Sequence, residues 1–406
     1  MKSWPSLEIP PINRELPALE LKATSGQHLN RKFFNSYICG ITPYDATHLG
    51  HAATYLAFDL VHRYQYLRGK NLNFIENITD VDDPLLERAT RDGVDWKNLA
   101  ANQVELFARD MTALHILPPK KYLSVSETID LVVAGMQILD KQDQIYELEG
   151  DHYYDVSKHL SKLPISLTEA LKVFGERGGD PDRAGKRHPL DPLVWRKNIP
   201  GEPGWESPFG FGRPGWHIEC SVIAMQALQL GEIGIDEPIL DIQGGGSDLI
   251  FPHHFMTRVI AEDISKRTFA AQYVHTGMIG LAGTKMSKSL GNLVFVHKLL
   301  EENIDPMVIR HALLSGKYSA DRSWSDDLLQ SSKEQIERLR TALSKLDVAP
   351  TEPVISEVIE ALADDLDTPR ALAALNSWAL STLTGKEGGN AGNLSRFIDG
   401  TLGLAL

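Results

Sequence analysis

Two histidines near the start of the chain are placed to bind phosphate. His48 and His51 flank Gly50 in the first turn of a predicted helix, where residues three apart project from one side. Exposed backbone amides and the helix dipole favour an anion there, and Gly50 lets a nucleotide lie against the backbone. For this pair alone, the alternative is two surface histidines.

Two lysines in the second half of the chain could act on the same nucleotide. Lys285 and Lys288 lie between Gly283 and Gly291, which suits a loop that closes over bound nucleotide. There the lysines would stabilise departing pyrophosphate. Taken alone, an exposed basic loop is the alternative, because lysine is usually exposed.

Between these groups lie residues that could bind zinc. The chain has two cysteines, Cys39 and Cys220, and a histidine pair, His253 and His254. Two cysteines are too few for a disulfide framework, and free cysteines are often small buried apolar residues. Two thiolates and one imidazole would instead leave one zinc position open. That position would select cysteine, since zinc binds a thiolate well and a hydroxyl poorly.

A predicted strand, helix and strand position the histidine pair. Residues 36–39 are typical of a short buried strand, residues 48–67 of a helix with Thr47 as its N-cap, and residues 72–75 of a second strand. The first turn of such a right-handed unit lies at the carboxyl edge of a parallel sheet, where nucleotides bind.

The pattern of the whole chain predicts an α/β protein with five segments. They are a leader over 1–32, a first catalytic half over 33–144, an insertion over 145–215, a second catalytic half over 216–300 and a helical region over 301–406. Further strands are predicted at 239–242 and 272–278, and helices near 328–346, 354–363 and 369–383, with 385–393 as a flexible loop.

Composition argues against several classes of protein. The 406 residues are 42% hydrophobic and carry a formal net charge of −13, which repels a polyanion on average. Residues 331–406 hold seven basic and eleven acidic residues, so we expect no nucleic-acid partner. No secretory signal and no apolar run of about 18 residues occurs. We therefore expect a cytoplasmic protein without membrane contact, and a monomer.

His48-Leu49-Gly50-His51 after the first strand and Lys285-Met286-Ser287-Lys288-Ser289 after the last resemble the signatures of class I aminoacyl-tRNA synthetases. The resemblance implies a Rossmann-type parallel sheet split by a connective insertion, with ATP and an amino acid meeting above the carboxyl ends of the strands. It also implies Mg²⁺ accompanying ATP, and catalytic roles for the two histidines and the two lysines.

Three further segments, residues 39–42, 212–221 and 251–254, resemble the cysteinyl branch of that family. By this resemblance Cys39, Cys220 and His253 bind one zinc ion per chain, with His254 as the alternative histidine. Trp216 would pack on the cysteine and Asp248 would anchor its ammonium group, although such a tryptophan is elsewhere usually core. The implied substrate residues are Cys39, Gly40, Ile41, Thr42, Thr54, Asn77, Ile78, Thr79, Trp216, Gly246, Ser247, Asp248 and Ile279.

One position separates the chain from the synthetases. Cysteinyl-tRNA synthetases carry a glutamate ligand four residues after the first histidine, where this chain has Thr257. The segment Glu-Arg-Gly-Gly-Asp-Pro at 176–181 and the short region after 364–369 instead resemble the ATP-dependent ligases of mycothiol biosynthesis. Those ligases are cysteinyl-synthetase relatives that join cysteine to the amine of glucosaminyl-inositol, and the resemblance covers roughly residues 1–406.

The resemblance implies two chemical steps. Cysteine and ATP give cysteinyl adenylate and pyrophosphate, and the amine of 1-O-(2-amino-2-deoxy-α-D-glucopyranosyl)-1D-myo-inositol then displaces AMP to form an amide. The amine must lose a proton, and residues 176–181 are a candidate contact for the sugar. The alternatives are a cysteinyl-tRNA synthetase, which the negative charge disfavours, and a non-catalytic paralogue that senses cysteine or binds a protein through its zinc cleft.

Overall fold

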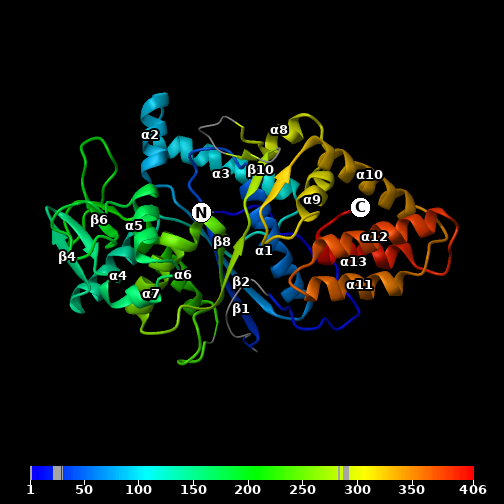
Figure 1. The fold of residues 1–406 in the computed structure, drawn as a ribbon, viewed down its shortest axis with the longest axis horizontal. Coiled ribbons are helices and arrows are strands. Elements are labelled where there is room, and N and C mark those ends of the chain that lie inside the picture. The colour runs from blue at the N-terminus through cyan, green and yellow to red at the C-terminus, as the bar shows by residue number, and fades with distance from the viewer. Residues whose placement is uncertain (1, 22–28, 30, 232, 282–283, 287–291) are drawn as a thin grey trace.

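A five-stranded parallel sheet lies at the centre of the molecule (Figure 1). The computed structural model describes residues 2–406 except 22–28, 30, 232, 282–283 and 287–291. The strand order is β3-β2-β1-β8-β9, and each neighbouring pair is parallel. The strands are β1 Phe33–Ile41, β2 Asn71–Ile78, β3 Lys121–Ser124, β8 Leu240–Gly246 and β9 Ala270–Thr276. The predicted α/β class with a Rossmann-type sheet is confirmed, and its switch point lies between β1 and β8.

Helices cover both faces of this sheet. Successive side chains of a strand point to opposite faces, so Ile38 of β1 joins the core formed with α1, whereas Tyr37 and Cys39 join the core formed with α4, α6 and α7. Cys39 therefore faces α6, which carries Cys220, and α7, which begins just after His253 and His254. The helices are α1 Leu49–Leu67, α2 Asp83–Asp92, α3 Trp96–Ala113, α4 Ile129–Lys141, α6 Trp216–Ala224 and α7 Phe255–Ser265.

Helix α1 is capped by a histidine. The N-cap residue is His48 rather than the predicted Thr47, and its Nδ1 accepts a hydrogen bond from the backbone N–H of Gly50 at 3.1 Å. A side-chain acceptor in this position satisfies one of the amides that a helix leaves unpaired at its start. The helix ends at Leu67, as predicted.

A second sheet occupies one end of the molecule, where the periodicity of the sequence fades. Its order is β4-β5-β6-β7, and its neighbouring strands are antiparallel. The strands are β4 Ile145–Leu148, β5 Asp151–Tyr154, β6 Leu193–Lys197 and β7 Gly212–Pro214, and α5 Leu167–Glu176 lies between β5 and β6. Strands of three to five residues are too short to show a clear alternation, which explains why the sequence did not predict them.

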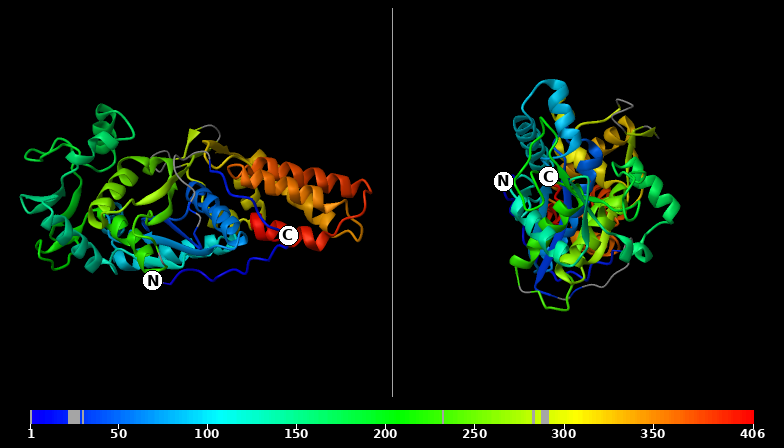
Figure 2. Two further views of the ribbon diagram at one scale, coloured as in Figure 1. Left: turned by 90° about the horizontal axis from the view of Figure 1, so that it is seen from below. Right: turned by 90° about the vertical axis from the view of Figure 1, so that its left-hand side faces the viewer.

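Helices form the opposite end of the molecule (Figure 2). They are α8 Val296–Glu301, α9 Pro306–Leu314, α10 Asp326–Leu343, α11 Thr351–Ala363, α12 Thr368–Leu383 and α13 Ala391–Leu402. The predicted loop at 385–393 overlaps α13, which begins at Ala391 with Asn390 as its N-cap. The leader runs to this end: the backbone N–H of Glu20 donates to the carbonyl of Ala363 at 2.9 Å. The predicted division into five segments stays a prediction.

A small sheet connects the catalytic and helical parts. It contains β10 Ile279–Leu281, β11 Thr284–Lys285 and β12 Arg322–Trp324, with β10 in the middle. Among the described residues, no helix combines the length and the apolarity that a bilayer span requires.

A buried charge cluster joins α1 to the helical region. Asp59 of α1 pairs with Arg63 at 2.8 Å and with Arg310 of α9, and all three are at most 1% exposed. Arg63 also donates to the carbonyl of Asp399 at 2.9 Å, and Arg310 to that of Leu402 at 2.7 Å. Burial opposes ionisation of Asp59, but the two guanidinium groups outweigh it and hold its pKa below the ordinary value.

Candidate active site

A cavity of about 330 Å³ opens at the carboxyl edge of the central sheet. Its walls come from the end of β1, the start of α1, and the ends of β8 and β9. These elements meet at the switch point between β1 and β8, where parallel α/β sheets bind ligands. We refer to this space as the nucleotide cleft.

The histidine pair lies in the wall of the nucleotide cleft. The rings of His48 and His51 are stacked with centroids 3.9 Å apart, and both residues line the cavity. A Cβ atom added to Gly50 would lie 2.9 Å from Cε1 of His48, so the glycine leaves room for the ring. The structure thus brings both predicted catalytic histidines to one helix terminus, which is suited to an anion.

The predicted lysines lie largely outside the described residues. Lys285 belongs to β11, but the structure describes only its backbone, and Lys288 is not described. Met286, between them, is 7% exposed and lines the nucleotide cleft. The lysine segment therefore reaches the cleft at Met286, and the roles of the two lysines stay predictions.

Two cysteines and one histidine converge beside the cleft. The ligand atoms of Cys39, Cys220 and His253 all lie within 4.8 Å of one another, and all three residues are buried. Thiolate and imidazole ligands around one zinc ion are separated by roughly 4 Å, so the cluster fits such an ion. Nε2 of His253 has no hydrogen-bond partner among the described residues, as expected for an atom that would coordinate a metal.

Further histidines surround this cluster. Nδ1 of His253 lies 3.0 Å from Nδ1 of His217, Nε2 of His254 lies 3.2 Å from the sulfur of Cys39, and Nδ1 of His254 lies 2.8 Å from Nε2 of His275. Burial lowers the pKa of His253 and of His254 well below the ordinary value, which keeps the imidazoles neutral. A neutral His254 with its proton on Nε2 can donate to a Cys39 thiolate and accept from His275, and such contacts orient metal ligands.

Electrostatics around Cys220 also favour a bound cation. Burial, followed by the neighbouring sulfur of Cys39, raises the pKa of the Cys220 thiol well above its ordinary value. In a buried site without a positive charge close by, the Cys220 thiol would stay protonated. A divalent metal supplies that charge, since a coordinating thiol is deprotonated.

Two contacts fix the histidine segment. The ring of Trp216 stacks on His253 with centroids 4.0 Å apart. A guanidinium N–H of Arg177 donates to the carbonyl of Phe251 at 2.9 Å, two residues before His253. The Glu-Arg-Gly-Gly-Asp-Pro segment therefore supports the candidate metal site, a contact that the sequence did not reveal.

Most of the predicted substrate residues line the nucleotide cleft. Those that do are Cys39, Gly40, Ile41, Thr42, Thr54, Trp216, Gly246, Asp248 and Ile279. Asn77, Ile78, Thr79 and Ser247 are not among the residues that bound this cavity. Substrate contact by any of these residues stays a prediction.

Asn77 instead holds the floor of the cleft. Its Oδ1 accepts hydrogen bonds from Tyr37 Oη and from the backbone N–H of Gly40, both at 2.8 Å, and its Nδ2 donates to Thr79 Oγ1 at 3.0 Å. The register between β1 and β2 shifts between Ile38 and Ile41. The amide of Asn77 thus replaces a ladder hydrogen bond at the irregularity that aims Cys39 into the site.

Sequence reasoning missed part of the wall. Tyr44, Asp45, Tyr55, Thr276 and Met278 also line the nucleotide cleft. Thr276 lies near the end of the predicted strand at 272–278, so the rule that ligands meet strand ends could have found it. The others carry no motif of their own.

A second cavity, of about 730 Å³, adjoins the first. Thr42, Tyr44 and Trp216 line both cavities. The remaining wall comes from the start of α2, from the insertion sheet and from residues 177–180. The segment that the sequence proposed as a sugar contact therefore faces this space, which we call the second cavity.

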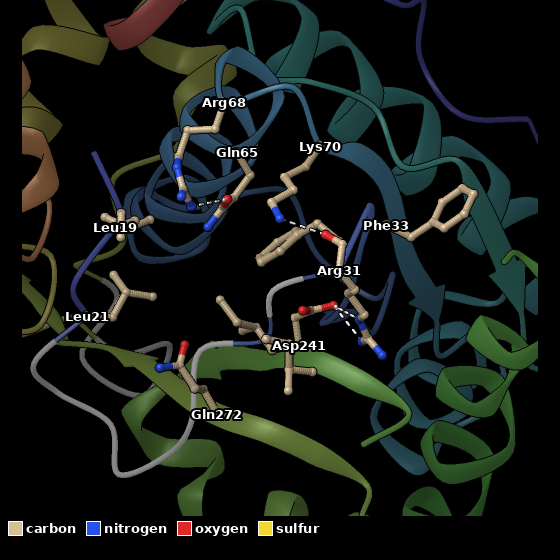
Figure 3. Close-up of a pocket in the computed structure, with 13 residues that line it drawn as sticks. Leu19, Leu21, Arg31, Phe33, Gln65, Arg68, Lys70, Asp241 and Gln272 are labelled. Carbon is tan, nitrogen blue, oxygen red and sulfur yellow. Dashed lines mark hydrogen bonds and ion pairs between the residues drawn. The ribbon is translucent and has the colours of Figure 1, made fainter. Parts of the chain in front are cut away.

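A third cavity, of about 300 Å³, lies at the opposite, amino edge of the sheet (Figure 3). Figure 3 shows Asp241 facing Arg31, and their side chains are 2.6 Å apart. Lys70 donates to the carbonyl of Arg31 at 2.7 Å. The main charged groups of this third cavity thus bind one another. The cavity lies away from the predicted catalytic residues.

Comparison with protein families gives one match over most of the chain. The family described as tRNA synthetases class I (C) catalytic domain matches residues 26–334. The match spans the nucleotide cleft, the second cavity and the candidate metal cluster.

Curated relatives match the entire chain. Each of three is called L-cysteine:1D-myo-inositol 2-amino-2-deoxy-alpha-D-glucopyranoside ligase. The identity is 45% over 420 residues for Gordonia bronchialis, 47% over 426 for Segniliparus rotundus and 46% over 417 for Streptomyces griseus. Each alignment covers 100% of this chain and 100% of the relative.

Solved structures share the fold at low identity. Mycobacterium tuberculosis methionyl-tRNA synthetase in complex with methionyl-adenylate matches with a TM-score of 0.62 and 17% identity, over 92% of this chain and 89% of that chain. The LeuRS of Agrobacterium radiobacter, in a ternary complex with tRNA and LeuAMS, matches with a TM-score of 0.63 and 11% identity, over 93% and 84%. These likenesses bear on the fold alone.

Proposed function

This chain belongs to the family of L-cysteine:1D-myo-inositol 2-amino-2-deoxy-α-D-glucopyranoside ligases, within the class I tRNA synthetases, and we propose that it joins cysteine to the amine of that glycoside. ATP would be converted to AMP and pyrophosphate, and the product would serve mycothiol biosynthesis. The observation that carries the proposal is the Cys39, Cys220 and His253 cluster beside the His48 and His51 pair. We propose that this arrangement places a site for a thiol next to a site for a triphosphate.

The first step would form cysteinyl adenylate. The carboxylate of cysteine attacks the α-phosphorus of ATP, a carboxylate oxygen to phosphorus bond forms, and the bond to the β-phosphate bridging oxygen breaks. Negative charge then grows on the phosphate oxygens, where ring N–H groups of His48 and His51 can donate at the positive end of the α1 dipole. Lys285 and Lys288 are proposed to stabilise the leaving pyrophosphate.

Cysteine selection is assigned to the metal cluster. Cys39, Cys220 and His253 would hold one zinc ion, which when bound offers an open position to the substrate thiolate. Trp216, stacked on His253, is proposed to pack on the bound cysteine. Asp248, exposed at the end of β8, is proposed to accept the ammonium group of cysteine, and Mg²⁺ is proposed to accompany ATP.

A product experiment tests the function. The protein is given cysteine, ATP and either the glucosaminyl-inositol acceptor or tRNA, and the products are identified by mass. We expect the cysteinyl amide of the amino sugar, AMP and pyrophosphate, with no charged tRNA. Serine in place of cysteine is the matched control, and it should support at least about 10²-fold less pyrophosphate exchange into ATP.

Other outcomes of this experiment would favour the alternatives. Charged tRNA without the amide would indicate a cysteinyl-tRNA synthetase. The absence of cysteine-dependent exchange would indicate a non-catalytic binding protein. The monomeric state, the cytoplasmic location and the lack of a nucleic-acid partner stay predictions of the sequence.

A further inference from the structure

The second cavity lies next to the nucleotide cleft, where a second substrate would have to bind. It shares Thr42, Tyr44 and Trp216 with the nucleotide cleft, so a molecule within it borders the space assigned to the adenylate. Its volume of about 730 Å³ lies within the range of roughly 300–1,000 Å³ that is usual for small-molecule sites. An acceptor held there can approach the reacting carbonyl without displacing the nucleotide.

The walls of the second cavity suit a polyhydroxylated ligand. Most of its charged side chains are already paired: Arg196 contacts Asp83 at 2.8 Å, and Arg183 contacts Asp151 at 2.6 Å. Paired charges keep spare donor and acceptor positions for hydroxyl groups without presenting a large net charge. Trp216, which is only partly buried, adds an aromatic surface.

Asp82 differs from the other carboxylates of this cavity. It is partly buried, and no ion pair of Asp82 is found in the part of the chain that the structure describes. Its Oδ1 accepts the backbone N–H of Asp83 at 2.9 Å, and its Oδ2 lies 3.5 Å from Thr42 Oγ1. Because Thr42 belongs to both cavities, the Asp82 carboxylate lies at the wall between them. Two other carboxylates of this cavity are less suitable for contact with a ligand. Glu219 is only 1% exposed, and Glu87 lies on the exposed surface of α2.

We propose that the second cavity binds the amino-sugar acceptor and that Asp82 receives its ammonium group and takes the proton that the nitrogen must lose; this inference rests on the proposed function. Proton transfer to the carboxylate frees the nitrogen lone pair. That pair forms the bond to the cysteinyl carbonyl carbon, and the bond from this carbon to the phosphate oxygen breaks. AMP leaves with both electrons of that bond, and the second proton of the amine passes to solvent.

Local electrostatics suit Asp82 to this role. Burial raises the pKa of Asp82 to about 6. The negative charge of Asp83 adds to this rise in pKa. A hydrogen bond from the backbone N–H of Asp83, the positive charge of Arg213 and a hydrogen bond from the Thr42 hydroxyl oppose it. The carboxylate is therefore ionised at neutral pH and attracts an ammonium ion, but remains basic enough to take a proton.

Asp82 is the N-cap residue of α2. Asp82→Asn is therefore a sharp test, because asparagine is also a good N-cap and keeps the start of α2 intact. Three rates are measured: cysteine-dependent pyrophosphate exchange, trapping of the adenylate by hydroxylamine, and single-turnover transfer to the glucosaminyl-inositol acceptor. We expect the variant to keep the first two rates and to lose about 10²-fold or more in the third. Asp92→Asn, which removes the same charge from the exposed end of α2, is the matched control and should keep all three.

The pH profile separates proton transfer from a merely structural role. In the unchanged protein, the transfer rate should rise as pH increases through about 6. The Asp82→Asn variant should lose this pH dependence. The Asp82→Glu variant, which has a carboxylate again, should show part of it. Normal transfer by Asp82→Asn, or loss of exchange and transfer together, would overturn the assignment. A failure of the proposed function is distinguishable, since the unchanged protein would then form no amide although exchange persists.

Discussion

Cys39 is contacted on several sides of its sulfur atom. The sulfur lies 3.2 Å from Nε2 of His254 and within 4.8 Å of the ligand atoms of Cys220 and His253. Cys39→Ser keeps the size of the side chain but offers a hydroxyl, which zinc binds poorly. We expect the purified variant to lose its zinc, as measured by elemental analysis, and pyrophosphate exchange to fall by about 10²-fold or more. Circular dichroism checks the fold, and normal exchange by a zinc-free variant would contradict the assignment.

At the scale of residues, the sequence predicted types of ligand better than their surroundings. Cys39, Cys220 and His253 could be predicted because their segments resemble those of a known family, and the structure brings them together. His275 and Arg177 could not, because their roles depend on contacts with residues far away in the chain. A histidine outside a motif is equally compatible with the protein surface, and the motif that contains Arg177 does not record its contact with Phe251.

The end of strand β1 depends on a glycine. A Cβ atom on Gly40 would lie 1.6 Å from the backbone oxygen of Asn77, far inside the contact distance of any two atoms. We expect Gly40→Ala to push β1 from β2, to lower stability by about 1–3 kcal/mol, and to raise the KM for cysteine. Thermal unfolding and pyrophosphate exchange measure the two effects. Gly392→Ala is the control, since its nearest contacts are 3.5 Å away; equal behaviour of the two variants would contradict this account.

At the scale of elements, segments with a clear helical period were predicted, and a helix that directly follows a glycine-rich stretch was not. Helix α1 was expected over 48–67 and spans Leu49–Leu67, and α12 was expected over 369–383 and spans Thr368–Leu383. Helix α13 was missed because Gly385, Gly388 and Gly389 before it are typical of a loop, and its own start at Ala391 followed too closely. The N-cap at His48 was missed because histidine seldom has that role.

At the scale of the whole molecule, the sequence predicted the parallel sheet but not what holds the parts together. The sheet follows from local alternation of strands and helices. The second cavity combines the start of α2 with β6, β7 and residues 177–180, and no local pattern records such a meeting. The same holds for the Asp59 cluster, whose members Asp59 and Arg310 are 251 residues apart.

The Asp59 cluster should decide whether the helical region stays docked. Asp59→Asn removes the counter-charge of Arg63 and Arg310, which remain buried, and breaking a buried pair in this way costs about 3–5 kcal/mol. Because Arg63 and Arg310 bind the carbonyls of Asp399 and Leu402, the loss should reach the end of α13. We expect thermal unfolding several degrees lower and faster amide hydrogen exchange in α13 than in the central sheet. Asp92→Asn removes an exposed carboxylate and should change neither measurement. If Asp59→Asn left α13 as protected as in the unchanged protein, the cluster would not be what attaches this helix.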